Sequence, residues 1–352
     1  MLTLFDPLNA GAFKLKNRVV MAPLTRSRAG ETRVPNDLMA EYYAQRASAG
    51  LIISEATAIS REGYGWGNAP GIYTDEHTAG WRKVTDVVHR AGGLMVLQLW
   101  HMGRVSHPDF LDGELPVAPS AIAAEGESKS IHKPYVTPRA MTQADITRVI
   151  GDYASAARRA MDAGFDGVQI HGANGYLIDQ FLKASSNQRM DRYGGSVANR
   201  ARFLLEVCAA VAAEVSAERT ALRVSAVNGY NSMNDSDLPG LFTYVAKELN
   251  ALNLAFLEMK EPASAQIATP HVRANFKGVL IGNEGYDGDT AARAVESGRL
   301  DAVAFGTKFL ANPDLVERLR RHVPLNAPDP VTFYKGVREG YTDYPFLSDR
   351  AA

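Results

Sequence analysis

Three side chains able to do chemistry stand close together in the stretch HGANGYL at 171–177, namely His171, Asn174 and Tyr176. A histidine and an asparagine can donate hydrogen bonds to an oxygen that gains negative charge, and a tyrosine can deliver a proton. Taken singly, such residues are more often a satisfied core histidine, a turn asparagine and a packed aromatic. The glycines at 172 and 175 favour a ligand site, because missing side chains let a flat molecule approach closely.

Three more polar residues, Thr25, Gln98 and Arg223, lie in or just after other apolar runs of the chain. A buried guanidinium needs an anionic partner, and no carboxylate motif beside Arg223 obviously supplies one. A bound anion or an electron-rich ring would serve instead. The combination therefore predicts a polar, ring-sized pocket.

A second cluster lies near the other end of the chain, where GNEG (282–285) and FGTKFLANPD (305–314) each end an apolar run. Loops after the last two strands of an α/β barrel commonly bind phosphate through backbone N–H groups and a helix N-terminus. The plainer interpretation is two glycine-containing turns. Combined with the polar pocket, the cluster implies a phosphorylated planar cofactor.

The elements that must position these residues alternate regularly. Short apolar runs predict eight strands, at 18–22, 51–55, 94–99, 166–170, 221–225, 255–259, 278–282 and 302–306. Helical periodicity fills the gaps, at 35–48, 76–91, 143–163, 198–215, 238–252, 288–297 and 312–321, with 262–276 the weakest helix. Eight βα units without a linker predict an α/β fold, a (β/α)8 TIM barrel. A doubly wound sheet would normally carry GxGxxG after its first strand, and this chain does not.

Two details refine the prediction. Thr142 with Asp145 resembles a capping box, and Asn312 before Pro313 predicts a helix start. Strand residues in a barrel alternate between the interior and the surrounding helices. If the aliphatic residues face the helices, then Gln98, Gln169, His171 and Arg223 face the upper interior, where barrel enzymes place their chemistry. Trp100 shares the face of Gln98.

The eight units without a linker predict one domain over 1–352, and the stretch 100–141, rich in Pro, Gly and His, predicts a long excursion across the barrel mouth. The tail from 323 onward is expected to be irregular. A formal net charge of −1 and the lack of long apolar or basic runs argue against nucleic-acid or membrane partners. The single cysteine, Cys208, excludes internal disulfides and cysteine-held clusters. With no signal peptide at the start, we expect a cytoplasmic setting.

Several longer stretches resemble the Old Yellow Enzyme family. They are MAPLTRSRA (21–29), AEYYAQRASAGLIISEAT (40–57), GNAPGIYTDE (67–76), QLWHMGR (98–104), HGANGYL, DRYGGSVANRARF (191–203) and FGTKFLANPDL (305–315). The resemblance spans nearly the whole chain in the family's order. It implies an FMN-containing barrel that oxidises NADPH or NADH and reduces activated alkenes such as enones, enals, maleimides and nitroalkenes, and it implies phenolic ligands as inhibitors.

The resemblance also implies roles for individual residues. His171 and Asn174 would hold the substrate oxygen, and Tyr176 would protonate the α-carbon after hydride reaches the β-carbon. Trp66, Trp100 and Tyr341 would line the substrate side. The FMN-binding residues would be Pro23, Leu24, Thr25, Ala56, Gln98, Arg223, Gly282, Asn283, Gly306, Thr307 and Lys308. The threonine at 25 places the chain in the family's Thr-containing branch. Thr307 departs from the family, which usually has arginine there, and Glu284 adds a negative charge beside the same loop.

Other interpretations remain open from the residues alone. A phosphate-binding isomerase or aldolase without flavin would need a base at the strand ends, and Glu258 and Lys260 are the candidates. A flavin-bound electron carrier without substrate turnover would have no use for Tyr176. A metal site from His101 and His107 lacks a third ligand at a supporting spacing, so no metal is expected. The sequence does not indicate an oligomeric state.

Overall fold

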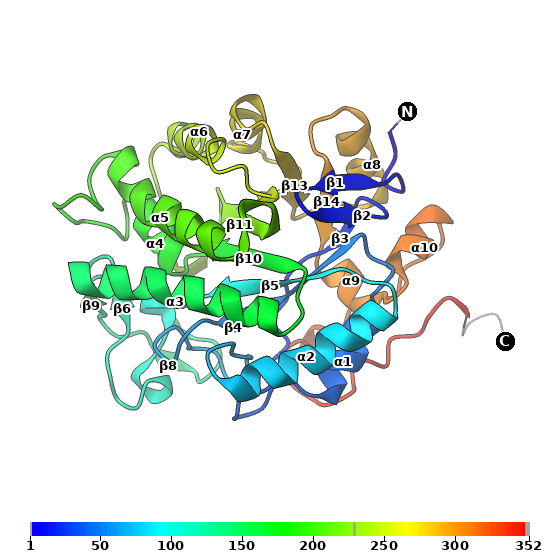
Figure 1. Ribbon diagram of the computed structural model, residues 1–352, viewed down its shortest axis with the longest axis horizontal. Helices are drawn as coiled ribbons and strands as arrows, with labels where there is room; N and C mark the ends of the chain where they lie inside the picture. Colours follow the sequence, from blue (N-terminus) through cyan, green and yellow to red (C-terminus); the bar gives the residue numbers. More distant parts are fainter. Residues whose placement is uncertain (1, 228–229, 349–352) are drawn as a thin grey trace.

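The computed structural model describes residues 2–227 and 230–348, and its centre is a closed barrel of eight parallel strands (Figure 1). The strands are β3 (Val19–Met21), β4 (Leu51–Ala58), β5 (Met95–Trp100), β10 (Gly167–Gly172), β11 (Thr220–Ser225), β12 (Phe256–Lys260), β13 (Val279–Asn283) and β14 (Ala302–Phe305). They pair in chain order, and β14 closes the ring against β3. All eight predicted strands and the (β/α)8 barrel are therefore confirmed.

Helices surround the barrel in the predicted alternation (Figure 1). They are α1 (Asp37–Ala44), α2 (Asp75–Arg90), α3 (Gln143–Asp162), α5 (Val197–Val215), α6 (Leu238–Leu249), α7 (Thr269–Asn275), α8 (Gly288–Glu296) and α10 (Leu315–Arg320). The weakest predicted helix, 262–276, contains α7. The short helices α4 (Leu177–Leu182) and α9 (Thr307–Ala311), which follow β10 and β14, were not predicted.

The two predicted helix starts had different outcomes. Thr142 and Asp145 form the expected reciprocal capping box at the start of α3. The prediction for Asn312 and Pro313 is wrong, because α10 begins at Leu315. The Asn312 side chain instead accepts a hydrogen bond from the backbone N–H of Asn326 (2.7 Å) and so fixes the start of the tail.

The predicted alternation of faces is confirmed on the strands that carry the polar residues. The aliphatic side chains Val168, Ile170, Leu222 and Val224 pack into the core between the barrel and its helices. The intervening residues then face the barrel interior, because successive side chains point to opposite sides of a strand.

An N-terminal hairpin that the sequence analysis missed closes one end of the barrel. Its strands are β1 (Leu8–Ala10) and β2 (Phe13–Leu15), paired antiparallel. Ala10, Phe13 and Leu15 pack in one cluster with residues at the beginnings of the barrel strands, including Val20 and Leu51. The hairpin therefore fills the amino-terminal end of the barrel, which leaves the carboxyl ends of the strands for a site.

The predicted excursion after the third barrel strand has little regular structure. It contains the 3₁₀ turns η1 (Gly103–Val105) and η2 (Pro108–Phe110), and the short strands β6 (Val117–Ala118), β7 (Glu127–Ser128), β8 (Lys133–Pro134) and β9 (Arg139–Ala140). Other 3₁₀ turns are η3 (Ala217–Arg219), η4 (Tyr230–Ser232) and η5 (Pro330–Thr332), the last lying in the otherwise irregular tail.

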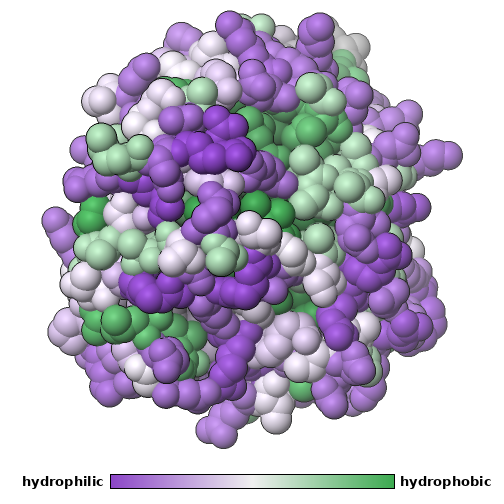
Figure 2. Space-filling model, turned by 60° about the vertical axis from the view of Figure 1, so that its left-hand side comes forward, coloured by the Kyte–Doolittle hydropathy of each residue, from purple (hydrophilic) through white to green (hydrophobic). Residues whose placement is uncertain are grey.

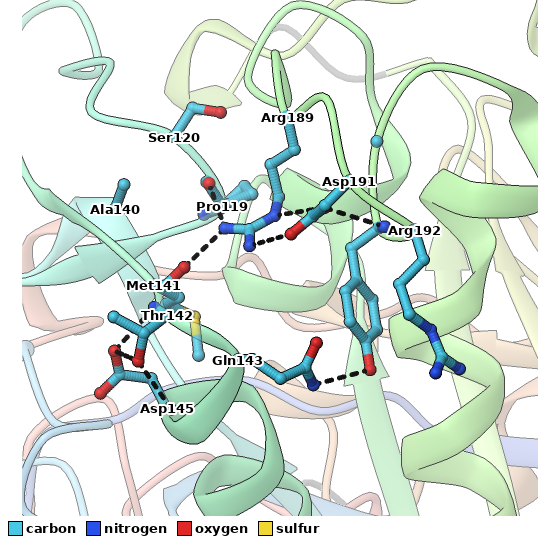
Figure 3. Close-up of polar contacts among 12 residues, drawn as sticks. Pro119, Ser120, Ala140, Met141, Thr142, Gln143, Asp145, Arg189, Asp191 and Arg192 are labelled. Carbon is cyan, nitrogen blue, oxygen red and sulfur yellow. Dashed lines mark hydrogen bonds and ion pairs between the residues drawn. The ribbon is translucent and has the colours of Figure 1, made fainter.

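Arg189 ties the base of this excursion to the segment after α4 (Figure 3). Its guanidinium donates to the backbone oxygens of Pro119 (2.9 Å) and Met141 (2.6 Å) and pairs with Asp191 (2.5 Å). Asp191 and its neighbour Tyr193 belong to the DRYGG stretch, and Tyr193 donates to Glu206 on α5 (2.8 Å). This stretch therefore has a structural role in holding the two loops that follow β5 and β10.

The outer surface is mixed in character. Hydrophilic residues cover most of the face seen in Figure 2, with apolar residues between them. Among the described residues, none of the helices is both long and apolar enough to cross a bilayer.

Candidate active site

A cavity of about 500 Å³ opens at the carboxyl ends of the barrel strands. That volume lies in the range of ordinary cofactor and small-molecule sites. The cavity is lined by ten of the eleven residues predicted to bind the cofactor, namely Pro23, Leu24, Thr25, Ala56, Gln98, Arg223, Asn283, Gly306, Thr307 and Lys308. It is also lined by His171, Asn174, Tyr176 and Trp66. The structure thus brings together residues from both ends of the chain.

Three predicted site residues do not line the cavity. A Cβ at Gly282 would lie 2.3 Å from Leu300 Cδ1, so this glycine permits close packing against the helix layer. Tyr341 is fully buried with its ring stacked on Tyr42, at a centroid distance of 4.1 Å. Trp100 is also fully buried and packs edge-on against the ring of Tyr176 at a centroid distance of 5.0 Å. Neither Trp100 nor Tyr341 lines the cavity in this structure, and their contact with substrate stays a prediction.

The turn after β10 sets the spacing of His171, Asn174 and Tyr176. Asn174 has a left-handed backbone (φ 60°), and its N–H donates to Ser225 Oγ at 2.9 Å. Gly175 also has positive φ, and a Cβ there would lie 2.7 Å from Asn231 Cβ. Only glycine fits this position without strain. The turn brings Tyr176 back over the end of its strand, with its ring edge-on to His171 at 5.0 Å.

Burial determines the protonation states of these residues. Desolvation, reinforced by the charges of Arg223 and Lys260, holds the pKa of His171 well below its usual value. The ring is therefore neutral near pH 7 and carries one N–H. Desolvation also raises the pKa of Tyr176 far above its usual value. The phenol therefore keeps its proton at neutral pH and can donate it.

Three buried polar atoms around the cavity have no hydrogen-bond partner within the described part of the chain. They are Arg223 Nε, His171 Nδ1 and Asn174 Oδ1. Buried polar groups are nearly always hydrogen-bonded, and leaving one unpaired costs about 1–3 kcal/mol. These atoms therefore fit a bound molecule with polar groups on both sides.

Arg223 also has a carboxylate partner that sequence reasoning missed. Glu258 on the neighbouring strand β12 is fully buried and forms an ion pair with Arg223 Nη1. Arg223 Nη2 donates to Asn283 Oδ1 at 2.9 Å, and Asn283 Nδ2 donates to the backbone of Ala304 at 2.8 Å. Desolvation raises the pKa of Glu258, and the charge of Arg223 opposes that shift.

The far end of the cavity is formed by the two loops predicted to bind phosphate. Its lining includes Asn283 to Tyr286 after β13 and Gly306 to Lys308 at the start of α9. Glu284 does not stand as an isolated negative charge, because Lys260 Nζ pairs with its carboxylate at 2.9 Å. The first N–H groups of a helix lack partners within the helix, so this wall can receive an anion.

The opposite side of the cavity uses residues that sequence reasoning did not single out. Lys129 and Tyr135 come from the excursion, and Tyr334 comes from the tail. Tyr334 lies 5.2 Å from the ring of Trp66, whose Nε1 donates to Ser27 Oγ. The Pro-rich composition of these segments gave no periodic signal by which their contacts could be predicted.

No group of three or more His, Cys, Asp or Glu side chains suited to a metal ion occurs within residues 2–227 and 230–348. His101 and His107 each use Nδ1 to accept a backbone N–H two residues further along. Their conformations are thus explained by local turns.

Comparisons with known proteins agree with this geometry. A protein of Leishmania infantum named "Probable flavin mononucleotide-dependent alkene reductase" is 47% identical over 355 residues, covering 98% of this chain and 97% of that protein. The solved Old Yellow Enzyme homologue of Zymomonas mobilis superposes with a TM-score of 0.96 at 48% identity, over 98% of this chain and 100% of that one. Morphinone reductase in complex with tetrahydroNAD gives 0.96 at 46% identity, over 100% and 99%.

The chain also matches a model of a whole protein family. Residues 3–326 match the family described as NADH:flavin oxidoreductase / NADH oxidase. That span contains the closed barrel and every residue that lines the cavity except Tyr334. The chain therefore belongs to the NADH:flavin oxidoreductase / NADH oxidase family, the family of the Old Yellow Enzyme that its motifs resemble.

Proposed function

We propose that this cavity is the active site of an FMN-dependent ene-reductase, with His171, Asn174 and Tyr176 as its catalytic residues. Membership of the family makes the protein a flavin-dependent oxidoreductase that uses NAD(P)H. The observation that carries the proposal is that Arg223, His171 and Asn174 line one cavity, and each has a buried polar atom without a partner among the described residues. The residues of both walls fit a flat, phosphorylated cofactor.

The proposed cofactor contacts follow from the lining. Arg223 presents a planar guanidinium, a cation with several hydrogen-bond donors, at the cavity wall. Gln98 and Thr25 offer an amide and a hydroxyl for the edge of a ring system, and Pro23, Leu24 and Ala56 offer apolar surface. Backbone N–H groups near Gly306, with Thr307 and Lys308, would hold the phosphate.

The catalytic residues divide the remaining chemistry. FMN bound at this site would supply a hydride for the β-carbon of the alkene. Negative charge then builds on the substrate's carbonyl or nitro oxygen, where His171 and Asn174 can each donate a hydrogen bond. His171 is neutral and so carries one N–H, and no described protein group bonds its Nδ1 and thereby fixes which nitrogen bears the hydrogen. Tyr176 is neutral too and can protonate the α-carbon.

The residues at the mouth of the cavity indicate the class of substrate. Small activated alkenes suit a mouth lined by Trp66, Tyr135 and Tyr334, and phenols should act as inhibitors because they present an oxygen to the same donors. NADPH is our proposed reductant, and NADH is the alternative. The non-flavin isomerase hypothesis loses its candidate bases, since Glu258 is paired with Arg223 and Lys260 with Glu284.

A spectrum and a titration test this function. The purified protein should be yellow and should release FMN, not FAD, on acid treatment. Anaerobic NADPH should bleach the flavin band, and 2-cyclohexenone should restore it without oxygen. A colourless protein that FMN does not reconstitute would refute the cofactor. A flavin that NADPH bleaches but no activated alkene reoxidises would indicate an electron carrier instead.

A further inference from the structure

A chain of buried hydrogen bonds runs behind the wall on which we place the ring of the cofactor. Gln98 Nε2 donates to Gln169 Oε1 at 2.8 Å, and Gln169 Nε2 donates to Glu258 Oε2 at 2.7 Å. The other oxygen of Glu258 pairs with Arg223. Gln98 and Arg223 line the cavity, whereas Gln169 and Glu258 are fully buried behind it and do not appear in the lining. One carboxylate therefore connects two residues of the cavity wall.

The direction of this chain depends on the charge of Glu258. An ionised carboxylate can only accept hydrogen bonds, so Gln169 must turn its NH₂ group toward it. Gln169 then presents its oxygen to Gln98, so Gln98 must donate a hydrogen bond to it from its own NH₂ group. Reversing either amide would place two acceptors or two donors against each other. The orientation of the Gln98 amide at the cavity is thus set by a residue two side chains away.

The same carboxylate governs how much positive charge Arg223 presents. A buried guanidinium without a counter-charge is strongly disfavoured. Asn283 cannot supply that counter-charge, since its amide oxygen is neutral and its Nδ2 already donates to Ala304. Glu258 is the carboxylate that contacts Arg223 among the ion pairs of the described residues. Arg223 lines the cavity, and its buried Nε has no partner among the described residues.

We propose that Glu258 is a positioning residue that tunes the reduction potential of the bound flavin, by offsetting the charge of Arg223 and by fixing the direction of the Gln98 amide through Gln169. This inference rests on the proposed FMN site. A reduced flavin carries more negative charge than an oxidised one. Glu258 therefore disfavours the reduced form, and its absence should favour it.

The test is the midpoint potential of bound FMN in the parent protein, Glu258→Gln, Glu258→Asp and Gln169→Leu. Glu258→Gln removes the negative charge and adds an NH₂ group, which should reverse both amides and leave Arg223 less compensated. We expect the affinity for reduced FMN, relative to oxidised FMN, to rise about tenfold, a shift of about 30 mV toward positive potential for a two-electron couple. Glu258→Asp retains the charge and should restore most of the parental potential.

Gln169→Leu separates the two effects, because it breaks the amide chain and leaves the Glu258–Arg223 pair in place. We expect it to change the flavin absorption bands with a smaller change of potential than Glu258→Gln. An unchanged potential in Glu258→Gln would overturn the inference. If that variant does not fold, an unchanged flavin spectrum and potential in Gln169→Leu would overturn it as well. A parent protein that binds FMN and reduces cyclohexenone keeps the proposed function intact in either case.

Discussion

The ring of Tyr176 meets the ring of His171 edge to face, with centroids 5.0 Å apart and planes inclined at 74°. On another side it meets Trp100 at the same centroid distance and 81°. Such edge-to-face pairs contribute about 0.5–1.5 kcal/mol beyond their burial. Tyr176 is therefore held between two rings from neighbouring strands, which fixes the position of its hydroxyl relative to the proposed hydrogen-bond donors. Trp100 acts on the site by holding this ring.

Replacing Tyr176 by phenylalanine should separate proton delivery from hydride supply. The phenyl ring keeps both edge-to-face contacts, so the change removes only the hydroxyl. Reduction of the flavin by NADPH should be nearly unaffected, while reoxidation by cyclohexenone should slow by about 10²–10⁴-fold, the usual contribution of general acid catalysis. Stopped-flow measurement of the two half-reactions checks this.

Tyr153→Phe provides a matched control for that substitution. Tyr153 is buried in the core outside the cavity, and its hydroxyl lacks a partner among the described residues. Both half-reactions should proceed at the parental rate in this variant. A parental rate of alkene reduction in Tyr176→Phe would mean that another group delivers the proton.

Replacing His171 or Asn174 by alanine should weaken the binding of phenolic ligands such as p-hydroxybenzaldehyde. A hydrogen bond to a charged group contributes about 1.5–3 kcal/mol, so each change should raise the dissociation constant by about tenfold to a hundredfold. Asn199→Ala, on α5 and outside the cavity, should bind the ligand as the parent does. Ligand-induced changes in the flavin spectrum report the binding, and parental affinity in both site variants would place the donors elsewhere.

Much of this site follows from period-two reasoning on single strands. The alternation around Gln169 and His171 correctly predicted which side chains enter the barrel, because a strand allows only two faces. Partners between strands were not predictable in the same way. Glu258 lies 35 residues after Arg223, and their contact depends on the register of β11 against β12, which the sequence does not display.

Which residues reach the cavity rim was not predictable from the sequence for a related reason. Tyr334 and Tyr341 belong to one irregular tail, yet only Tyr334 reaches the cavity. Arg28 donates to the backbone oxygens of Phe333 (2.9 Å) and Lys335 (2.6 Å) and so positions this part of the tail. Tyr341 is held in the core by stacking on Tyr42. Such long-range contacts of an aperiodic segment leave no local pattern in the sequence.

Glu55 should make the stability of the protein depend on pH. It is fully buried in β4, and desolvation raises its pKa from 4.5 to about 7, against the hydrogen bond from the N–H of Arg26. Between these values the folded state retains a proton that the unfolded state loses, so the stability contributed by Glu55 falls as pH rises from 4.5 to about 7. The full effect is about 3 kcal/mol at 1.36 kcal/mol per pKa unit.

Urea unfolding of the parent and Glu55→Gln at several pH values between 5 and 8, with FMN held saturating, measures this effect. The free energy of unfolding of the parent should fall relative to that of the variant as pH rises, and the difference should level off above pH 7. Glu296 is exposed, so the free energy of unfolding of Glu296→Gln should change with pH in the same way as that of the parent. A constant difference between parent and Glu55→Gln would show that the carboxyl does not change its ionisation on folding in this range.

Replacing Thr307 by arginine should tighten the binding of FMN. Thr307 is the first residue of α9 and lines the cavity beside Lys308, but it offers one hydroxyl and no charge. Lys260 cannot compensate freely, since it is paired with Glu284 at 2.9 Å. An arginine could grip the phosphate through two parallel hydrogen bonds. We expect a gain of roughly 1–3 kcal/mol in binding free energy, by analogy with other hydrogen bonds to charged groups.

FMN dissociation constants for the parent, Thr307→Arg and Lys308→Ala at two salt concentrations decide between the possible phosphate ligands. The advantage of Thr307→Arg should shrink at high salt, because a partly exposed ion pair is screened. Lysine binds phosphate as a point charge on a flexible stem. If backbone N–H groups make most of the contacts to the phosphate, Lys308→Ala should therefore weaken FMN binding only modestly. If arginine changes nothing, the phosphate is held by a group other than residue 307. If Lys308→Ala costs far more than arginine gains, Lys308 is the main phosphate ligand.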